Sequence, residues 1–145
     1  SYRTPPFSGR LAMNTDYVRE WGKRLVKEYE VVTPSIDAPV KLLSGGNIQR
    51  VIIAREFSQE PKLIIASHPT YGLDVAATEY VRKKLLEQRR RGAAILLVSE
   101  DLEELLALSD RVAVMYRGRF VGVLEADEIT LDRIRVMMAG EGEAS

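Results

Sequence analysis

The sequence contains no cysteine and a single histidine among its 145 residues. The lack of cysteine excludes a disulfide framework and thiolate metal ligands, and one histidine excludes a multi-histidine metal centre. Lysine plus arginine and aspartate plus glutamate number 21 each, so no net charge favours a nucleic acid or an anionic membrane as partner. No apolar stretch approaches the roughly 20 residues that span a bilayer. The composition fits one domain of ordinary size.

The sequence also lacks an initiator methionine and an apolar signal segment, since it begins Ser1-Tyr2-Arg3. We therefore expect a fragment of a longer protein. Residues 1–13 are expected to form an irregular lead-in because of two prolines and a glycine, and residues 141–145 are expected to fray.

Between these ends, the periodicity and the capping residues predict alternating helices and strands. Asn14 or Thr15 can cap a first helix, and two prolines make residues 31–40 a loop. Two short apolar runs, typical of buried strands, flank a long helix and predict a parallel βαβ unit. Arg117-Gly118 predicts a hairpin turn. The expected elements are helix 15–29, helix 46–58, strand 63–66, helix 75–91, strand 94–98, helix 101–108, hairpin strands 111–116 and 119–124, and helix 131–139.

The most informative string is Leu43-Ser44-Gly45-Gly46-Asn47-Ile48-Gln49-Arg50. Ser44 is a good N-cap, the glycines admit close approach of a ligand, and a helix start attracts anions. Ser-Gly-Gly alone is more often a simple capped helix. The string becomes more specific for a phosphate-binding role because an expected strand follows it. After that strand comes Pro69-Thr70-Tyr71-Gly72-Leu73-Asp74.

The three strings LSGGNIQR, KLIIASHPTYGLDVAA and LLVSEDLEELLALSDRVAVMYRGR together resemble ATP-binding subunits of ABC transporters, nearest to importers of simple sugars and nucleosides. The resemblance covers essentially the whole chain. It implies a partial P-loop NTPase (ABC ATPase) domain of the α/β class, from the second of two tandem copies. Residues 1–60 would be the helical subdomain with the signature, and residues 61–145 the C-terminal part of the catalytic α/β subdomain, with a parallel βαβ unit, a hairpin and a helix.

The chain departs from the family at three positions. The family carries a magnesium-binding aspartate and a catalytic glutamate at the end of the Walker B strand, where this chain has Ser67 and His68. The family's switch histidine is replaced by Glu100, which would repel a phosphate and otherwise suits the first turn of a helix. His68 could in principle act as a base, but a structural role is favoured. No G-x-x-x-x-G-K-[ST] loop occurs, so we expect no catalytic residue, no metal site and no ordinary ATP site within the chain.

The residues that face a partner domain look intact. The resemblance implies that Ser44, Gly45 and Gly46 contact the terminal phosphate of ATP bound to the first nucleotide-binding domain, with Asn47 and Gln49 nearby. Gly72-Leu73-Asp74 is similar to the D-loop, and Asp74 would bridge the two halves or cap the next helix, or both.

The resulting expectation is an ATPase subunit in which this chain lends its signature to a composite site and its own site is degenerate. ATP and magnesium would be cofactors of the full-length protein, and the fragment alone would be inert. The expected partners are the first nucleotide-binding domain, membrane permease subunits and, indirectly, a substrate-binding protein. The location would be cytoplasmic, at the inner face of the cell membrane.

Two alternatives remain open. The chain could belong to a non-catalytic module that completes a dimer without turnover, or to an ABC protein of translation or chromosome upkeep, which should show basic faces or coiled-coil inserts. The basic run Arg89-Arg90-Arg91 is better explained as complementing a helix C-terminus than as a nucleic-acid patch. An uncovered apolar flank of the two-stranded sheet would also invite self-association of the fragment.

Overall fold

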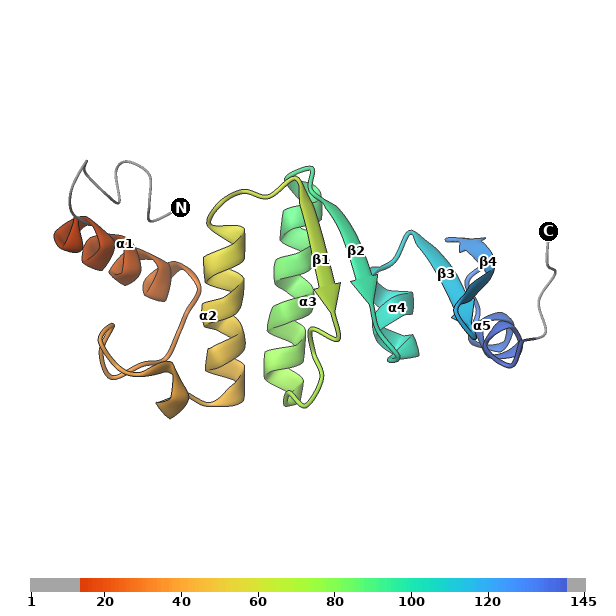
Figure 1. Ribbon diagram of the computed structural model, residues 1–145, viewed down its shortest axis with the longest axis horizontal. Helices are drawn as coiled ribbons and strands as arrows, with labels where there is room; N and C mark the ends of the chain where they lie inside the picture. Colours follow the sequence, from red (N-terminus) through yellow and green to blue (C-terminus); the bar gives the residue numbers. More distant parts are fainter. Residues whose placement is uncertain (1–13, 141–145) are drawn as a thin grey trace. The chain divides into compact units, whose positions relative to one another are not determined.

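The computed structural model describes residues 14–140, which form helices and strands in two compact units (Figure 1). Among the described residues, the first unit contains residues 14–63 together with Thr70–Ala94, and the second contains Ile64–Pro69 and residues 95–140. The lead-in predicted for residues 1–13 and the frayed end predicted for residues 141–145 lie outside the described residues.

The first unit is built from three α-helices and a short 3₁₀ helix. They are α1 (Thr15–Glu28), η1 (Val40–Leu42), α2 (Gly45–Phe57) and α3 (Val75–Arg90). Asn14 caps α1, because its Oδ1 accepts a hydrogen bond from the Tyr17 N–H (3.0 Å), as the sequence predicts. Helix α2 packs against both α1 and α3. The buried apolar residues of this unit include Tyr29, Ile53, Ala54, Phe57, Val81 and Leu85.

The buried face of α2 does not follow the run of four apolar residues at 51–54. Ile52 is 39% exposed, whereas Phe57, outside that run, is 5% exposed. Neighbouring helical side chains point about 100° apart, so four in a row cannot share one face. The core takes Ile53 and Ala54 together with Phe57, which follows them by four and three residues and so lies on the same side of the helix.

The long helix α3 ends as predicted. Arg89 and Arg90 lie in its last turn, where positive charge complements the negative pole of the helix. Arg91 is the C-cap, and Gly92 follows with φ of 91°, a left-handed conformation that glycine adopts without a steric penalty. The chain then enters the second strand.

Strands β1 (Leu63–Ser67) and β2 (Ala94–Val98) form the predicted parallel pair, and their arrows point the same way in Figure 1. Hydrogen bonds join the two starts, from the Ala94 N–H to the Lys62 carbonyl (2.9 Å), and the two ends, from the His68 N–H to the Val98 carbonyl (2.8 Å). This register places Ile65 opposite Leu96 on one face.

That face is exposed, although the sequence predicts buried strands. Ile65 is 67% exposed, Leu96 is 54% exposed and Val98 is 46% exposed, whereas Ile64 on the opposite face of β1 is 8% exposed. An apolar run is expected for a strand covered on both faces. The apolar flank expected to be uncovered is thus present in the structure.

The rest of the second unit consists of α4 (Leu102–Leu108), the hairpin of β3 (Arg111–Tyr116) and β4 (Arg119–Glu125), and α5 (Leu131–Met138). Arg117 and Gly118 have φ of 47° and 76°, and positive φ at both central residues is the signature of the type I′ turn. Helix α5 packs on the hairpin. The core of this unit consists of Val112, Val114, Leu124, Ile134 and Met137.

Candidate functional site

The signature string forms the start of α2, as predicted. Ser44 is the N-cap, with φ of −65° and ψ of 158°, and its Oγ accepts a hydrogen bond from the Asn47 N–H (3.4 Å). The first helical bond runs from the Ile48 N–H to the Ser44 carbonyl (2.9 Å), so the Gly45 and Gly46 N–H groups precede it and point out of the helix end. Such N–H groups and the positive helix pole suit an anion such as a phosphate.

Asn47 connects the signature to the chain that precedes it. Its Nδ2 donates to the Ser44 Oγ (3.0 Å), and its Oδ1 accepts from the Val32 N–H (2.8 Å). The Ser44 oxygen therefore accepts two hydrogen bonds from one residue, and its own proton remains available to donate. Asn47 thus holds the hydroxyl in one orientation.

The two glycines have different surroundings. A Cβ added at Gly45 would have nothing within 4 Å, whereas a Cβ added at Gly46 would lie 3.2 Å from the Ala77 Cβ of α3. Gly46 therefore lets the first turns of α2 and α3 approach each other, and Gly45 leaves the helix start open to a ligand.

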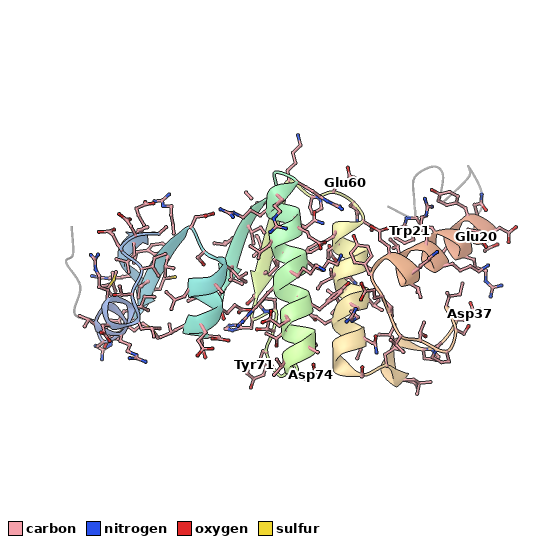
Figure 2. All side chains as sticks on the ribbon, turned by 180° about the vertical axis from the view of Figure 1, so that it is seen from behind. Glu20, Trp21, Asp37, Glu60, Tyr71 and Asp74 are labelled. Atoms are coloured by element: carbon pink, nitrogen blue, oxygen red, sulfur yellow. The ribbon has the colours of Figure 1, made fainter. Side chains whose placement is uncertain are left out.

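The predicted D-loop residues, Gly72, Leu73 and Asp74, lie directly before α3, so the same close contact brings them beside the signature. Asp74 caps α3, since its Oδ1 accepts from the Ala77 N–H (2.8 Å). Figure 2 shows Asp74 and the 88%-exposed Tyr71 at the end of α3 where α2 also begins. Gly72 has φ of 70°, which allows the turn ahead of the cap. The first unit thus brings two helix starts together.

The residues expected at the Walker B and switch positions, Ser67, His68 and Glu100, belong to the second unit. Ser67 is the last residue of β1, and His68 follows it with φ of 47°, a left-handed conformation that is unfavourable for a side chain larger than glycine. The His68 N–H bond to the Val98 carbonyl (2.8 Å) holds it beside the end of β2. Glu100 is exposed and precedes Asp101, the N-cap of α4.

The chemistry at the end of β1 does not fit magnesium, which is bound through carboxylate and phosphate oxygens. Ser67 supplies only a neutral hydroxyl and His68 an imidazole. Within residues 14–140, no group of three or more histidine, aspartate or glutamate side chains could hold a metal ion. Across the same residues, no helix has the length and apolar character of a membrane span.

Sequence reasoning missed a cluster behind the two helix starts. The guanidinium carbon of Arg50 on α2 lies 3.7 Å from the centroid of the Tyr80 ring on α3. Burial raises the pKa of Tyr80 to about 12, so its phenol stays protonated and donates to the Tyr29 carbonyl (2.8 Å). These residues are far apart in sequence, so no local pattern marks the contact, although Arg50 lies within the signature string.

No protein-family model matches the chain. Curated relatives do match it along almost its whole length. The guanosine import ATP-binding protein NupO of Bacillus subtilis is 43% identical over 140 residues, which are 97% of this chain and 28% of the relative. The glucose import ATP-binding protein TsgD13 of Haloferax volcanii is 38% identical over an alignment of 146 positions, which covers 99% of this chain and 26% of the relative.

A solved structure agrees with these relatives. The chain matches the dimeric ATP-binding cassette in a post-hydrolysis state bound to ADP and Pi, with a TM-score of 0.66 and 26% identity, over 83% of this chain and 52% of that one. The chain belongs to the ATP-binding cassette (ABC) family.

Family membership confirms the predicted fold class, a partial ABC ATPase domain of the α/β type. The chain spans about a quarter of the length of the curated relatives, at 28% and 26%, and about half of the solved ABC chain, at 52%. The relatives that it matches are ABC import ATP-binding proteins for nucleosides and sugars.

Proposed function

We propose that the chain supplies an ABC signature in trans to ATP held by a partner nucleotide-binding domain, while its own Walker B end is degenerate. In this proposal, the chain is the C-terminal part of the second nucleotide-binding domain of an importer subunit. Residues 1–60 are the helical subdomain, and residues 61–145 are the C-terminal part of the catalytic subdomain. The observation that carries the proposal is the pair of adjoining helix starts, with Ser44 and Gly45 open at one of them.

The start of α2 has the groups that a phosphate requires. The Ser44 hydroxyl proton is free to donate because its oxygen accepts from Asn47, and the Gly45 and Gly46 N–H groups precede the first helical bond. Gln49 lies one turn further along α2, near the same end. Preorganised donors of this kind stabilise charge that develops in a transition state, which is the role proposed for the signature during ATP hydrolysis.

The end of β1 supports the second half of the proposal. Hydrolysis needs a base to polarise the attacking water and magnesium to neutralise the phosphates. Neither Ser67 nor His68 offers a carboxylate, and the exposed Glu100 adds negative charge where a phosphate would lie. Magnesium and ATP would therefore bind to the partner domain's residues, and this chain contributes neither a catalytic base nor metal ligands.

The relatives indicate the kind of transporter. Both matched proteins are import ATP-binding proteins, one for guanosine and one for glucose, so nucleosides or simple sugars are the proposed cargo. The proposed partners are the first nucleotide-binding domain, the membrane permease and, indirectly, a substrate-binding protein. The subunit would lie in the cytoplasm against the permease at the inner face of the membrane, and α1 would transmit closure towards it.

The test is Ser44→Ala in the full-length protein that contains this chain. Loss of one preorganised donor is expected to lower ATPase turnover by about 10²–10³-fold. Ser58→Ala is the matched control, because Ser58 caps the opposite end of α2 and donates only to the Arg55 carbonyl (3.1 Å). Unchanged turnover in Ser44→Ala contradicts the proposal. An unmodified protein that binds ATP without hydrolysing it supports the alternative, a dimer-completing module without turnover.

A further inference from the structure

Helix α1 ends in a Schellman motif that has a glutamate where glycine is usual. Tyr29 is the C-cap, and the two bonds of the motif run from the Val31 N–H to the Val26 carbonyl (2.9 Å) and from the Glu30 N–H to the Lys27 carbonyl (3.3 Å). Glu30 has φ of 54°, which is unfavourable for a residue with a Cβ. Another interaction must therefore hold Glu30 in this conformation.

That interaction comes from both neighbouring helices. Arg50 Nη1 of α2 donates to the Tyr29 carbonyl (3.4 Å), to the Glu30 carbonyl (3.3 Å) and to Glu30 Oε2 (3.3 Å). Tyr80 Oη of α3 donates to the same Tyr29 carbonyl (2.8 Å), and its ring lies under the Arg50 guanidinium. The carbonyls of Tyr29 and Glu30, directly after the negative end of α1, thus receive one cation and one phenol.

The cluster lies at the same depth in both helices. Arg50 lies six residues after the N-cap Ser44, and Tyr80 lies six residues after the N-cap Asp74. At 1.5 Å per residue, that is about 9 Å behind each helix start. A shift of α1 therefore acts on both helices at equal distances from the signature and the D-loop.

A second connection reaches the signature directly. Three residues after Tyr29, the Val32 N–H donates to Asn47 Oδ1 (2.8 Å), and Asn47 Nδ2 donates to the Ser44 Oγ (3.0 Å). The chain that leaves α1 is thus connected to the signature hydroxyl through one side chain. The Arg50–Tyr80 contact fixes the start of this segment, and Asn47 fixes its other end.

We propose that the junction of Arg50, Tyr80 and the end of α1, together with Asn47, couples the position of α1 to the orientation of the Ser44 hydroxyl. The proposal rests on the proposed function in one respect, namely that Ser44 acts on ATP. Arg50, Tyr80 and Asn47 are then positioning residues, because they act through Ser44. Coupling is reciprocal, so ATP contact at Ser44 also favours one position of α1.

The test is Tyr80→Phe in the full-length protein, read by hydrogen–deuterium exchange and by ATPase kinetics. The variant removes only the bond to the Tyr29 carbonyl. A single hydrogen bond corresponds to about a fivefold change in a local opening equilibrium, so the Val32 amide should exchange about fivefold faster. The kcat with MgATP should fall by up to about fivefold while KM stays the same, because the signature acts in the transition state.

Tyr116→Phe is the matched control, since it removes a phenol from the second unit, at the end of β3. It should leave both the exchange of Val32 and kcat unchanged. Arg50→Lys is the second variant should Tyr80→Phe fail to fold, because lysine keeps the charge and loses the planar stacking and the fork of donors. It should change both readouts in the same direction.

If the Val32 amide exchanges at the same rate in these variants as in the unmodified protein, the proposed coupling is overturned. Faster exchange with unchanged kcat also overturns it, because the cluster would then be structural only. Ser44→Ala, measured in parallel, separates the two proposals. If that variant keeps full turnover, the proposed function fails, and the exchange data still decide whether the junction restrains the chain ahead of the signature.

Discussion

The contact between the first turns of α2 and α3 makes the two signature glycines respond differently to the same substitution. In Gly46→Ala the new Cβ would lie 3.2 Å from the Ala77 Cβ, which is closer than an ordinary contact of 3.4–4 Å. Ala77 is 8% exposed and its Cβ is fixed to the helix backbone, so the helix starts must separate by a few tenths of an ångström. In Gly45→Ala the new Cβ meets nothing within 4 Å.

The expected change in the free energy of unfolding results from two opposing effects, helix propensity and packing. Replacing a helical glycine by alanine stabilises by about 0.5–1 kcal/mol, and overpacking costs about 1–3 kcal/mol. We therefore expect Gly46→Ala to lower the free energy of unfolding by about 0.5–2 kcal/mol. Gly45→Ala should raise it by up to about 1 kcal/mol, while hindering access to the helix start.

The assay is urea unfolding of the chain, followed by far-UV circular dichroism and by fluorescence of Trp21, the single tryptophan of the sequence. The double variant Gly46→Ala/Ala77→Gly moves the Cβ from one helix to the other and should recover part of the loss, with a coupling of about 1 kcal/mol. Equal stabilities of the two single alanine variants, or no coupling in the cycle, would refute the close contact.

Three further predictions concern the rest of the molecule. Ile134→Ala should lower the free energy of unfolding by about 2–5 kcal/mol in a denaturation assay, because Ile134 is 1% exposed in the core of the second unit. Because the pKa of Tyr80 is raised from 10.0 to about 12, the stability that it contributes is present below pH 10 and is lost as the pH rises towards 12. In urea titrations at a series of pH values, Tyr80→Phe should weaken this alkaline loss of stability. If the free energy of unfolding depends on pH in the same way in both proteins, that result would count against the burial of the phenol. The exposed apolar face of β1 and β2 should make the 145-residue chain self-associate at high concentration, and Leu96→Glu should lower the mass measured by light scattering. A monomeric unmodified chain would contradict this last prediction.

Local signals were sufficient to predict most of the elements. The helix caps at Asn14, Ser44 and Asp74 and the turn at Arg117-Gly118 depend on neighbours within three residues, so the sequence contains the whole interaction. The family resemblance supplied the site residues, and membership in the ABC family is confirmed by the relatives. The roles of the individual site residues remain predictions.

What the sequence could not predict depends on partners that are distant along the chain. Tyr29 and Tyr80 are 51 residues apart, so nothing near either one in the sequence reveals their hydrogen bond. The same holds for the stacking of Arg50 on the Tyr80 ring. The apolar runs predicted burial of β1 and β2, and one face of the pair is exposed for a related reason. The apolar side chains of a strand such as residues 63–67 can be buried on either face, but the rest of the fold determines which face another layer covers.

If this chain contributes a signature but no catalytic base, Ser44→Ala and His68→Ala should differ sharply in their effect on ATP hydrolysis. Both variants are made in the full-length protein that contains the chain, and ATPase turnover with MgATP is measured for each. We expect Ser44→Ala to lower turnover by about 10²–10³-fold and His68→Ala to leave it within about twofold of the unmodified protein, or about 0.4 kcal/mol. A large loss in His68→Ala would show that His68 takes part in hydrolysis, and full turnover in Ser44→Ala would show that the signature serine does not.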